Sequence, residues 1–114
     1  MHQPAEQALR QLQESGKEFL ELFGYGTLSL EVYKPVGHDR QLPHERDEVY
    51  FIIAGSGVFN LEGKTYPFQP GDFFFVPARA EHRFQQFTDD FATWVIFYGP
   101  KGGEASGRPQ ELIS

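Results

Sequence analysis

Histidine is the first residue type in this sequence that suggests chemistry, and it occurs at four positions: His2, His38, His44 and His82. His44 is followed four residues later by Glu48, and an apolar run then extends to Gly55. On one straight strand the Cα atoms of His44 and Glu48 would lie about 13 Å apart, too far for both to bind one metal ion. The polar residues 45–47 between them predict a turn. We therefore expect His44 and Glu48 to face one another from adjacent strand ends.

A second polar segment surrounds His82. Gly71 and Asp72 predict a turn, after which residues 73–76 have the composition of a short strand. Pro77 ends that strand, and a short loop leads to His82 at the start of the next one. The chain has no Cys, no Ser in a nucleophile elbow and no Gly-rich loop in a strand–helix frame. Imidazole and carboxylate groups are therefore the main candidates for chemistry.

These segments, residues 37–57 and 71–82, resemble the two motifs of the cupin superfamily, small β-barrels that hold a metal ion or ligand inside. The first motif ends in Glu, six residues and Gly, as Glu48 and Gly55 do here, and His44 falls at its second His. The second motif is matched by Gly71, Pro77 and His82, whereas Arg79 stands where the family has a Gly. With the flanking strands the resemblance covers about residues 18–98 and implies a cupin barrel.

The resemblance implies three metal ligands: His44, Glu48 and His82. The family's first motif His would be residue 42, which is Leu in this chain. Gln41 is a candidate fourth ligand if Pro43 shifts the strand register. Two imidazoles and one carboxylate suit a divalent transition metal such as iron, manganese, nickel or zinc. The alternative is a barrel without metal, in which the two histidines are polar groups of a ligand pocket.

The period of two along strands predicts which side chains line the barrel interior. If Glu48 points inward, so does Tyr50, and if His82 points inward, so do Phe84 and Gln86. Trp94 belongs to the last strand, and the sequence does not assign its face. Aromatic walls with a few polar groups are typical of small-molecule sites, although Phe84 and Trp94 could equally fill the core.

Arginine is concentrated in or beside the two motif segments, where four of the six occur: Arg40, Arg46, Arg79 and Arg83. Guanidinium groups at the barrel mouth would favour an anionic ligand. Exposed ion pairs with neighbouring acids such as Glu45, Asp47 and Glu81 explain the same pattern without a ligand, and we favour that interpretation.

The remaining sequence supplies the elements that position these residues. Residues 4–15 predict a short helix, because Ala8, Leu9 and Leu12 form a narrow apolar stripe. Eight short strands are predicted at residues 18–23, 26–33, 48–54, 57–61, 64–68, 73–76, 82–87 and 91–98. Residues 100–114 predict a flexible tail. The fold class is therefore all-β: one antiparallel jelly-roll barrel (residues 17–99) behind an N-terminal helix (residues 1–16).

Composition limits the function. The chain has 114 residues, enough for one domain, and 18 aromatic side chains that favour strands. Its net charge of −6 disfavours nucleic acid, and it has neither a membrane-length apolar run nor a signal-peptide pattern. We expect a cytoplasmic protein, and the resemblance suggests a homodimer.

Two functions fit these residues. The first is a metal-dependent enzyme acting on a small organic molecule, with oxygenase, isomerase and lyase chemistry all open. The second is a non-catalytic cupin that binds or senses a sugar or organic acid and is possible without metal. The sequence identifies neither the catalytic residues nor the substrate.

Overall fold

The structure is a computed structural model and describes residues 1–104 and 109–113. Within them the chain forms one helix, α1 (Ala5–Ser15), followed by eight strands. The strands are β1 (Phe19–Tyr25), β2 (Leu28–Tyr33), β3 (Asp47–Ala54), β4 (Gly57–Leu61), β5 (Lys64–Phe68), β6 (Phe73–Val76), β7 (His82–Gln85) and β8 (Ala92–Tyr98). The flexible tail predicted at 100–114 falls partly on residues 105–108 and 114, which lie outside the described residues.

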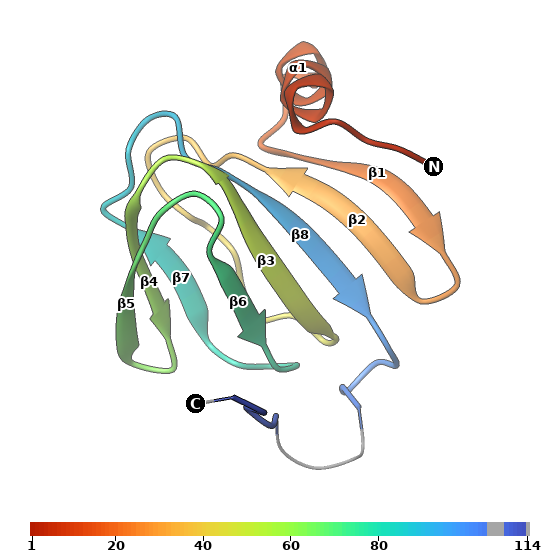
Figure 1. Cartoon of the computed structure of the whole chain (residues 1–114), viewed down its shortest axis with the longest axis vertical. Helices are drawn as coiled ribbons and strands as arrows, with labels where there is room; N and C mark the ends of the chain where they lie inside the picture. Colours follow the sequence, from red (N-terminus) through yellow and green to blue (C-terminus); the bar gives the residue numbers. More distant parts are fainter. Residues whose placement is uncertain (105–108, 114) are drawn as a thin grey trace.

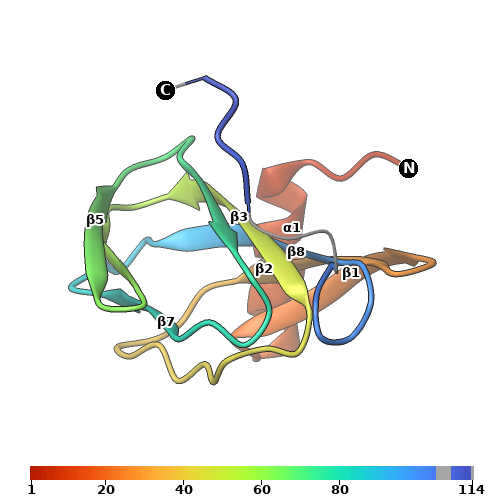
Figure 2. The same cartoon turned by 90° about the horizontal axis from the view of Figure 1, so that it is seen from below.

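The strands pair into two antiparallel sheets that face each other (Figures 1 and 2). The larger has the order β1-β2-β8-β3-β6 and the smaller the order β5-β4-β7. Neighbours in the larger sheet such as β2 and β8 are far apart in sequence, so the chain crosses between sheets as a jelly roll does. The predicted all-β barrel with one short N-terminal helix is confirmed.

Aromatic side chains fill the space between the sheets. Tyr50 projects from β3 and Phe59 from β4, and neither is exposed to solvent. Their rings meet edge to face with centroids 5.7 Å apart, an arrangement that aromatic quadrupoles favour. Phe84 packs at 4.6 Å from Phe59, and Phe91 at 4.7 Å from Phe84. Much of the aromatic content of the sequence is thus barrel core.

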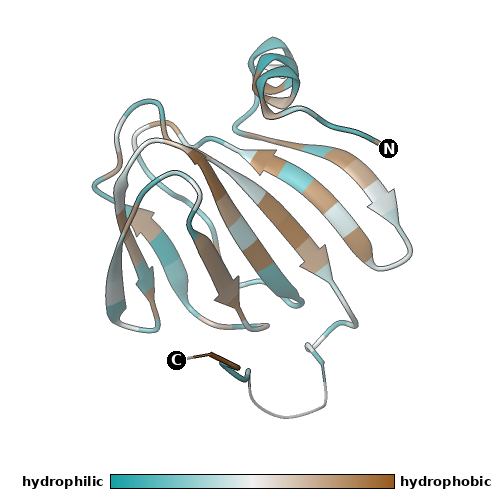
Figure 3. Cartoon of the chain, in the orientation of Figure 1, coloured by the Kyte–Doolittle hydropathy of each residue, from teal (hydrophilic) through white to brown (hydrophobic). Residues whose placement is uncertain are grey.

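The two faces of β2 contact different surroundings, as the alternating hydropathy in Figure 3 indicates. Val32 points outward and is completely buried under α1, where it contacts a cluster that includes Ala8 and Leu12 of the helix. Glu31 and Tyr33 instead line a cavity on the inner side of the sheet. The polar face of this strand therefore belongs to the barrel interior rather than to bulk solvent.

Two turns show why glycine is needed where strands reverse. Glu62 and Gly63 both have positive φ angles, 51° and 84°, as a tight hairpin turn between β4 and β5 requires. Gly55 follows β3 with φ +84°, and a Cβ there would lie 2.5 Å from the Cα of Phe91. Gly55 is therefore fixed both by its backbone angle and by the close approach of another segment.

Strand ends differ slightly from those predicted. β1 continues to Tyr25, and β7 stops at Gln85 because Gln86 adopts a φ of 51° that no extended strand contains. In the part of the chain that the structure describes, no helix combines the length and the apolar character needed to cross a membrane.

Candidate metal centre

His44, Glu48 and His82 converge in space, with one potential ligand atom from each lying within 4.8 Å of the others. Oε1 of Glu48 lies 2.9 Å from Nδ1 of His44 and 3.0 Å from Nε2 of His82. Two ligand atoms at about 2.1 Å from one ion, seen at about a right angle, are roughly 3 Å apart. The two distances from Glu48 Oε1 are therefore those of neighbouring ligands in a metal site.

Three parts of the fold bring these side chains together. Glu48 sits near the start of β3, between Val76 of β6 and Phe97 of β8, on the inner face of the larger sheet. His82 begins β7 in the facing sheet. His44 lies in the loop between β2 and β3, and its carbonyl oxygen accepts a hydrogen bond from the Arg79 N–H. A loop and both sheets therefore contribute one side chain each.

The hydrogen bonding of His82 leaves one ring nitrogen available. Nδ1 lies 2.9 Å from the carbonyl oxygen of Ala80, to which its N–H donates, so in the neutral ring Nε2 carries the lone pair. His82 Nε2 and Glu48 Oε2 are buried, and neither makes a hydrogen bond in the described residues, although Nε2 lies 3.0 Å from Oε1 of Glu48. Buried polar atoms without partners are costly, and binding a metal ion would satisfy both. The residues present therefore fit a metal ion.

The electrostatics of the cluster keep Glu48 charged. Burial alone would raise the pKa of the Glu48 carboxyl, but the neighbouring His44 and His82 outweigh burial and lower that pKa below its usual value. Burial likewise opposes the charged form of His82, yet the Glu48 carboxylate raises the pKa of the imidazole. A buried carboxylate that stays ionised is the form that binds a cation.

A hydrogen-bond network supports the cluster from one side. The buried Asp39 accepts a hydrogen bond from the side-chain Nε2 of Gln41 at 3.1 Å. Because the amide nitrogen is committed to Asp39, the amide oxygen faces the other way and accepts a bond from the hydroxyl of Tyr50 at 3.1 Å. Leu42, by contrast, is 74% exposed and is not among the residues that line the cavity beside His44. Gln41, not residue 42, therefore lines the cavity that His44 borders.

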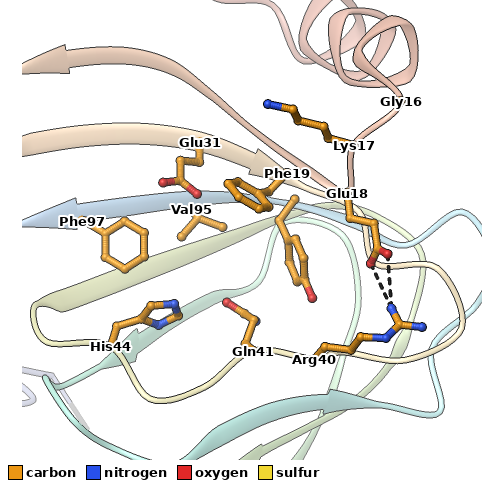
Figure 4. Close-up of a pocket in the computed structure, with 11 residues that line it drawn as sticks. Gly16, Lys17, Glu18, Phe19, Glu31, Arg40, Gln41, His44, Val95 and Phe97 are labelled. Atoms are coloured by element: carbon orange, nitrogen blue, oxygen red, sulfur yellow. Dashed lines mark hydrogen bonds and ion pairs between the residues drawn. The ribbon is translucent and has the colours of Figure 1, made fainter.

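A cavity of about 660 Å³ opens beside His44, as Figure 4 shows. The side chain of His44 is 32% exposed, whereas those of Glu48 and His82 are almost completely buried. The imidazole of His44 is thus the part of the cluster that borders the cavity. The other lining residues come from β1, β2, β8 and the loops beside them: Gly16, Lys17, Glu18, Phe19, Glu31, Tyr33, Arg40, Gln41, Val95 and Phe97.

The predicted pocket residues occupy three different places. Tyr50 is fully buried beside the cluster, with its ring centroid 6.0 Å from that of His82. Phe84 packs in the aromatic core, and together with the exposed Gln86 it borders a separate cavity of about 430 Å³. Trp94 lies on the outer face of β8 and packs against the cluster beneath α1. None of the four lines the cavity beside His44, whose walls come from β1, β2, other residues of β8 and the neighbouring loops.

The four arginines are engaged by groups of the protein itself. Arg40 forms an ion pair with Glu18 at 3.2 Å, and Arg79 lies 3.6 Å from Glu45. Arg46 donates to the carbonyl oxygen of Thr27, and Arg83 donates to that of Gln41. These contacts agree with the interpretation that the arginines bind groups of the protein rather than an anionic ligand.

Sequence reasoning did not select two residues of this region, Asp39 and Glu31. Asp39 lies in a loop, where an acidic residue is ordinary, and only its contacts with distant residues mark it out. Glu31 did carry a signal, because it is the one charged residue in the alternating strand sequence LSLEVY. That alternation indicated a polar face but not that the polar face turns toward a cavity.

Comparison with known proteins agrees with this fold. The family model of the cupin domain matches residues 29–98, more than half of the chain. This protein therefore belongs to the cupin family, and the three-residue cluster lies within or beside the strands of its barrel.

Three relatives illustrate the range of similar proteins. The "Uncharacterized protein SCO3923" of Streptomyces coelicolor is 33% identical over 63 residues, which is 55% of this chain and 60% of that protein. An acireductone dioxygenase of Bacillus thuringiensis is 39% identical over 54 residues, or 43% of this chain and 32% of the enzyme. The crystal structure of the DMSP lyase DddQ from Ruegeria pomeroyi superimposes with a TM-score of 0.60 at 30% identity, covering 71% of this chain and 46% of the lyase. This chain thus spans about 60% and about a third of the two curated relatives.

Proposed function

We propose that this protein binds one divalent transition-metal ion through His44, Glu48 and His82 and acts on a small organic molecule in the adjoining cavity. The observation that carries the proposal is the convergence of two imidazole nitrogens on one buried carboxylate, with Nε2 of His82 and Oε2 of Glu48 lacking hydrogen-bond partners. Two imidazoles and a carboxylate suit iron, manganese, nickel or zinc. When bound, such an ion would supply Lewis-acid or redox chemistry.

The protein's own residues have distinct parts in this function. Glu48 and His82 form the closed, buried side of the site, and the part-exposed His44 forms the side that borders the cavity. Gln41 lies on the same border, and its amide oxygen is oriented toward Tyr50 and the cluster. Burial and nearby acids raise the pKa of the Tyr50 phenol well above its usual value, so this hydroxyl stays a hydrogen-bond donor. Gln41 is accordingly the candidate fourth ligand.

Metal uptake tests the proposal directly. Protein purified without chelator should contain close to one equivalent of iron, manganese, nickel or zinc by elemental analysis. His44→Ala and His82→Ala should lose that metal, while His38→Ala should keep it, because His38 is exposed and outside the cluster. Circular dichroism and thermal unfolding show whether each variant stays folded. Folded wild-type protein that takes up none of these metals, even when they are supplied during refolding, would refute the metal site.

A second candidate function is metal-free ligand binding. Nδ1 of His44 is close enough to Glu48 to donate a hydrogen bond, so part of the cluster can be satisfied by hydrogen bonding alone. The family resemblance also covers only three of the four usual ligands, since the fourth position is Leu42, which is exposed. A metal-free protein that binds an organic ligand, with affinity reduced in His82→Gln, favours this function over the first. The homodimer and the cytoplasmic location stay predictions.

A further inference from the structure

The cavity beside His44 is lined by one carboxylate, that of Glu31, for which the described residues supply no side-chain partner. Glu31 projects from β2 toward the cavity, where Figure 4 shows its carboxylate on the side facing His44 and Gln41. Among the described residues it takes part in no side-chain hydrogen bond or ion pair, although Glu18, the other acid in the lining, pairs with Arg40. The negative charge of Glu31 is therefore available to a ligand.

The strand register places this carboxylate within reach of the candidate metal centre. Glu31 is opposite Val95 in β8, and Val95 is opposite Tyr50 in β3. Two strand spacings put the Cα atoms of Glu31 and Tyr50 roughly 10 Å apart on the inner face of one sheet. Glu48 lies two residues before Tyr50 on that face. A molecule of a few heavy atoms can therefore touch both His44 and Glu31.

The surroundings of Glu31 favour a positive charge. Glu21 is directly opposite on β1, and like charges at opposed positions destabilise a strand pair. Burial raises the pKa of the Glu31 carboxyl, and Glu21 and Glu48 act in the same direction, whereas His44 and Arg46 oppose the rise without cancelling it. Aromatic residues Phe19, Tyr33 and Phe97 line the same cavity, and the faces of such rings attract cations. A cationic ligand would offset the repulsion between the two acids.

The basic residues of the lining do not reverse this preference. The guanidinium of Arg40 is held by Glu18, and Lys17 is exposed at the rim, where water screens its charge. The net charge of −6 also attracts cations to the protein as a whole.

We propose that the cavity selects a small ligand carrying a cationic group, such as a substituted ammonium, and that Glu31 binds that group while the opposite end of the ligand faces the His44–Glu48–His82 cluster. The inference rests on the proposed function in taking this cavity as the ligand site. It adds the chemical class of the ligand and names Glu31 as the residue that determines specificity.

Two probes of equal shape test the inference. Choline and 3,3-dimethylbutan-1-ol both carry a hydroxyl group and differ in having a quaternary nitrogen or a carbon at the branched end. Titration calorimetry or ligand-observed NMR on the full chain should show that choline binds about tenfold more tightly. Glu31→Gln, which keeps the side-chain size, should abolish that preference. Glu6→Gln, on the exposed face of α1, should keep it.

The outcomes separate this inference from the proposed function. Equal binding of the two probes, no binding of either, or a preference that persists in Glu31→Gln would each overturn the inference. Metal content is measured on the same samples by elemental analysis. A metal-free protein that still prefers choline through Glu31 would refute the metal site alone, whereas a metal-loaded protein without the preference would refute the role of Glu31 alone. Thermal unfolding confirms that Glu31→Gln is folded.

Discussion

Asp39 offers the most direct test of how the loop before β3 is held. Its two carboxylate oxygens accept four hydrogen bonds: from the Tyr33 hydroxyl at 2.7 Å, the Phe84 N–H at 2.9 Å, the Gln41 N–H at 3.0 Å and the Gln41 side chain at 3.1 Å. Tyr33 is 7% and Phe84 1% exposed, so although each borders a cavity, their donors gain little water when Asp39→Ala removes the partner. Gln41 is less buried than these two residues, and its donors can be hydrated from the cavity that it borders.

The expected loss of stability in Asp39→Ala follows from the two buried donors, the Tyr33 hydroxyl and the Phe84 N–H. Each buried donor left without a partner costs about 1–3 kcal/mol, so Asp39→Ala should lower the free energy of unfolding by about 2–6 kcal/mol. Domains of this size are stable by only about 5–15 kcal/mol, so the loss is a large part of the total. Asp39→Asn keeps one acceptor oxygen in place, so it should lower the free energy of unfolding by less than Asp39→Ala does.

Urea denaturation of the metal-free protein measures this loss, with Asp90→Ala as the matched control. Asp90 is exposed and accepts one hydrogen bond, from the Thr88 hydroxyl, so its removal should cost less than about 1 kcal/mol. A loss for Asp39→Ala no greater than that of the control would refute the reasoning. It would mean that Tyr33 and Phe84 find other partners when the carboxylate is absent.

Three further predictions follow from the structure. Gly55→Ala should lower the free energy of unfolding, measured by chemical denaturation, by at least about 2 kcal/mol more than Gly63→Ala does. Both glycines have φ +84°, but only a Cβ at position 55 would clash with backbone. Equal losses would show that the close approach relaxes without a cost in stability. Gln41→Leu should weaken metal binding by about 10–100-fold in a chelator competition assay, and an unchanged affinity would remove Gln41 from the site. The stability of the metal-free protein should fall at both ends of the pH range. The pKa of Glu48 is lowered in the folded state, so its contribution is present above the ordinary value of 4.5 and is lost as pH falls through the folded pKa. The pKa of His82 is raised in the folded state, so its contribution is present below the ordinary value of 6.5 and is lost as pH rises through the folded pKa. Denaturation at a series of pH values should therefore show highest stability between about pH 4.5 and 6.5, and His82→Gln should remove the alkaline limb.

Much of the fold is predictable from the sequence because the signals are local. Alternation along residues 28–33, the turn residues Glu62 and Gly63, and Pro77 act within a few positions of the strands that they shape. Each of the eight predicted strands is present, and the differences are confined to strand ends such as Gln86, whose backbone angle depends on its surroundings. Local propensity and turn chemistry determine where strands form, but not exactly where they stop.

The sequence by itself also determined which residues could bind a metal, since the spacing of Glu48 from Gly55 and of Gly71 from His82 carries the family resemblance. Only the tertiary structure decided what surrounds them. Asp39 reaches the backbone of Phe84, 45 positions away, and Glu31 faces the cavity because β2 pairs with β8. Contacts between residues so distant in the chain depend on how the strands pair and on how the two sheets close over the core, and no local pattern encodes them.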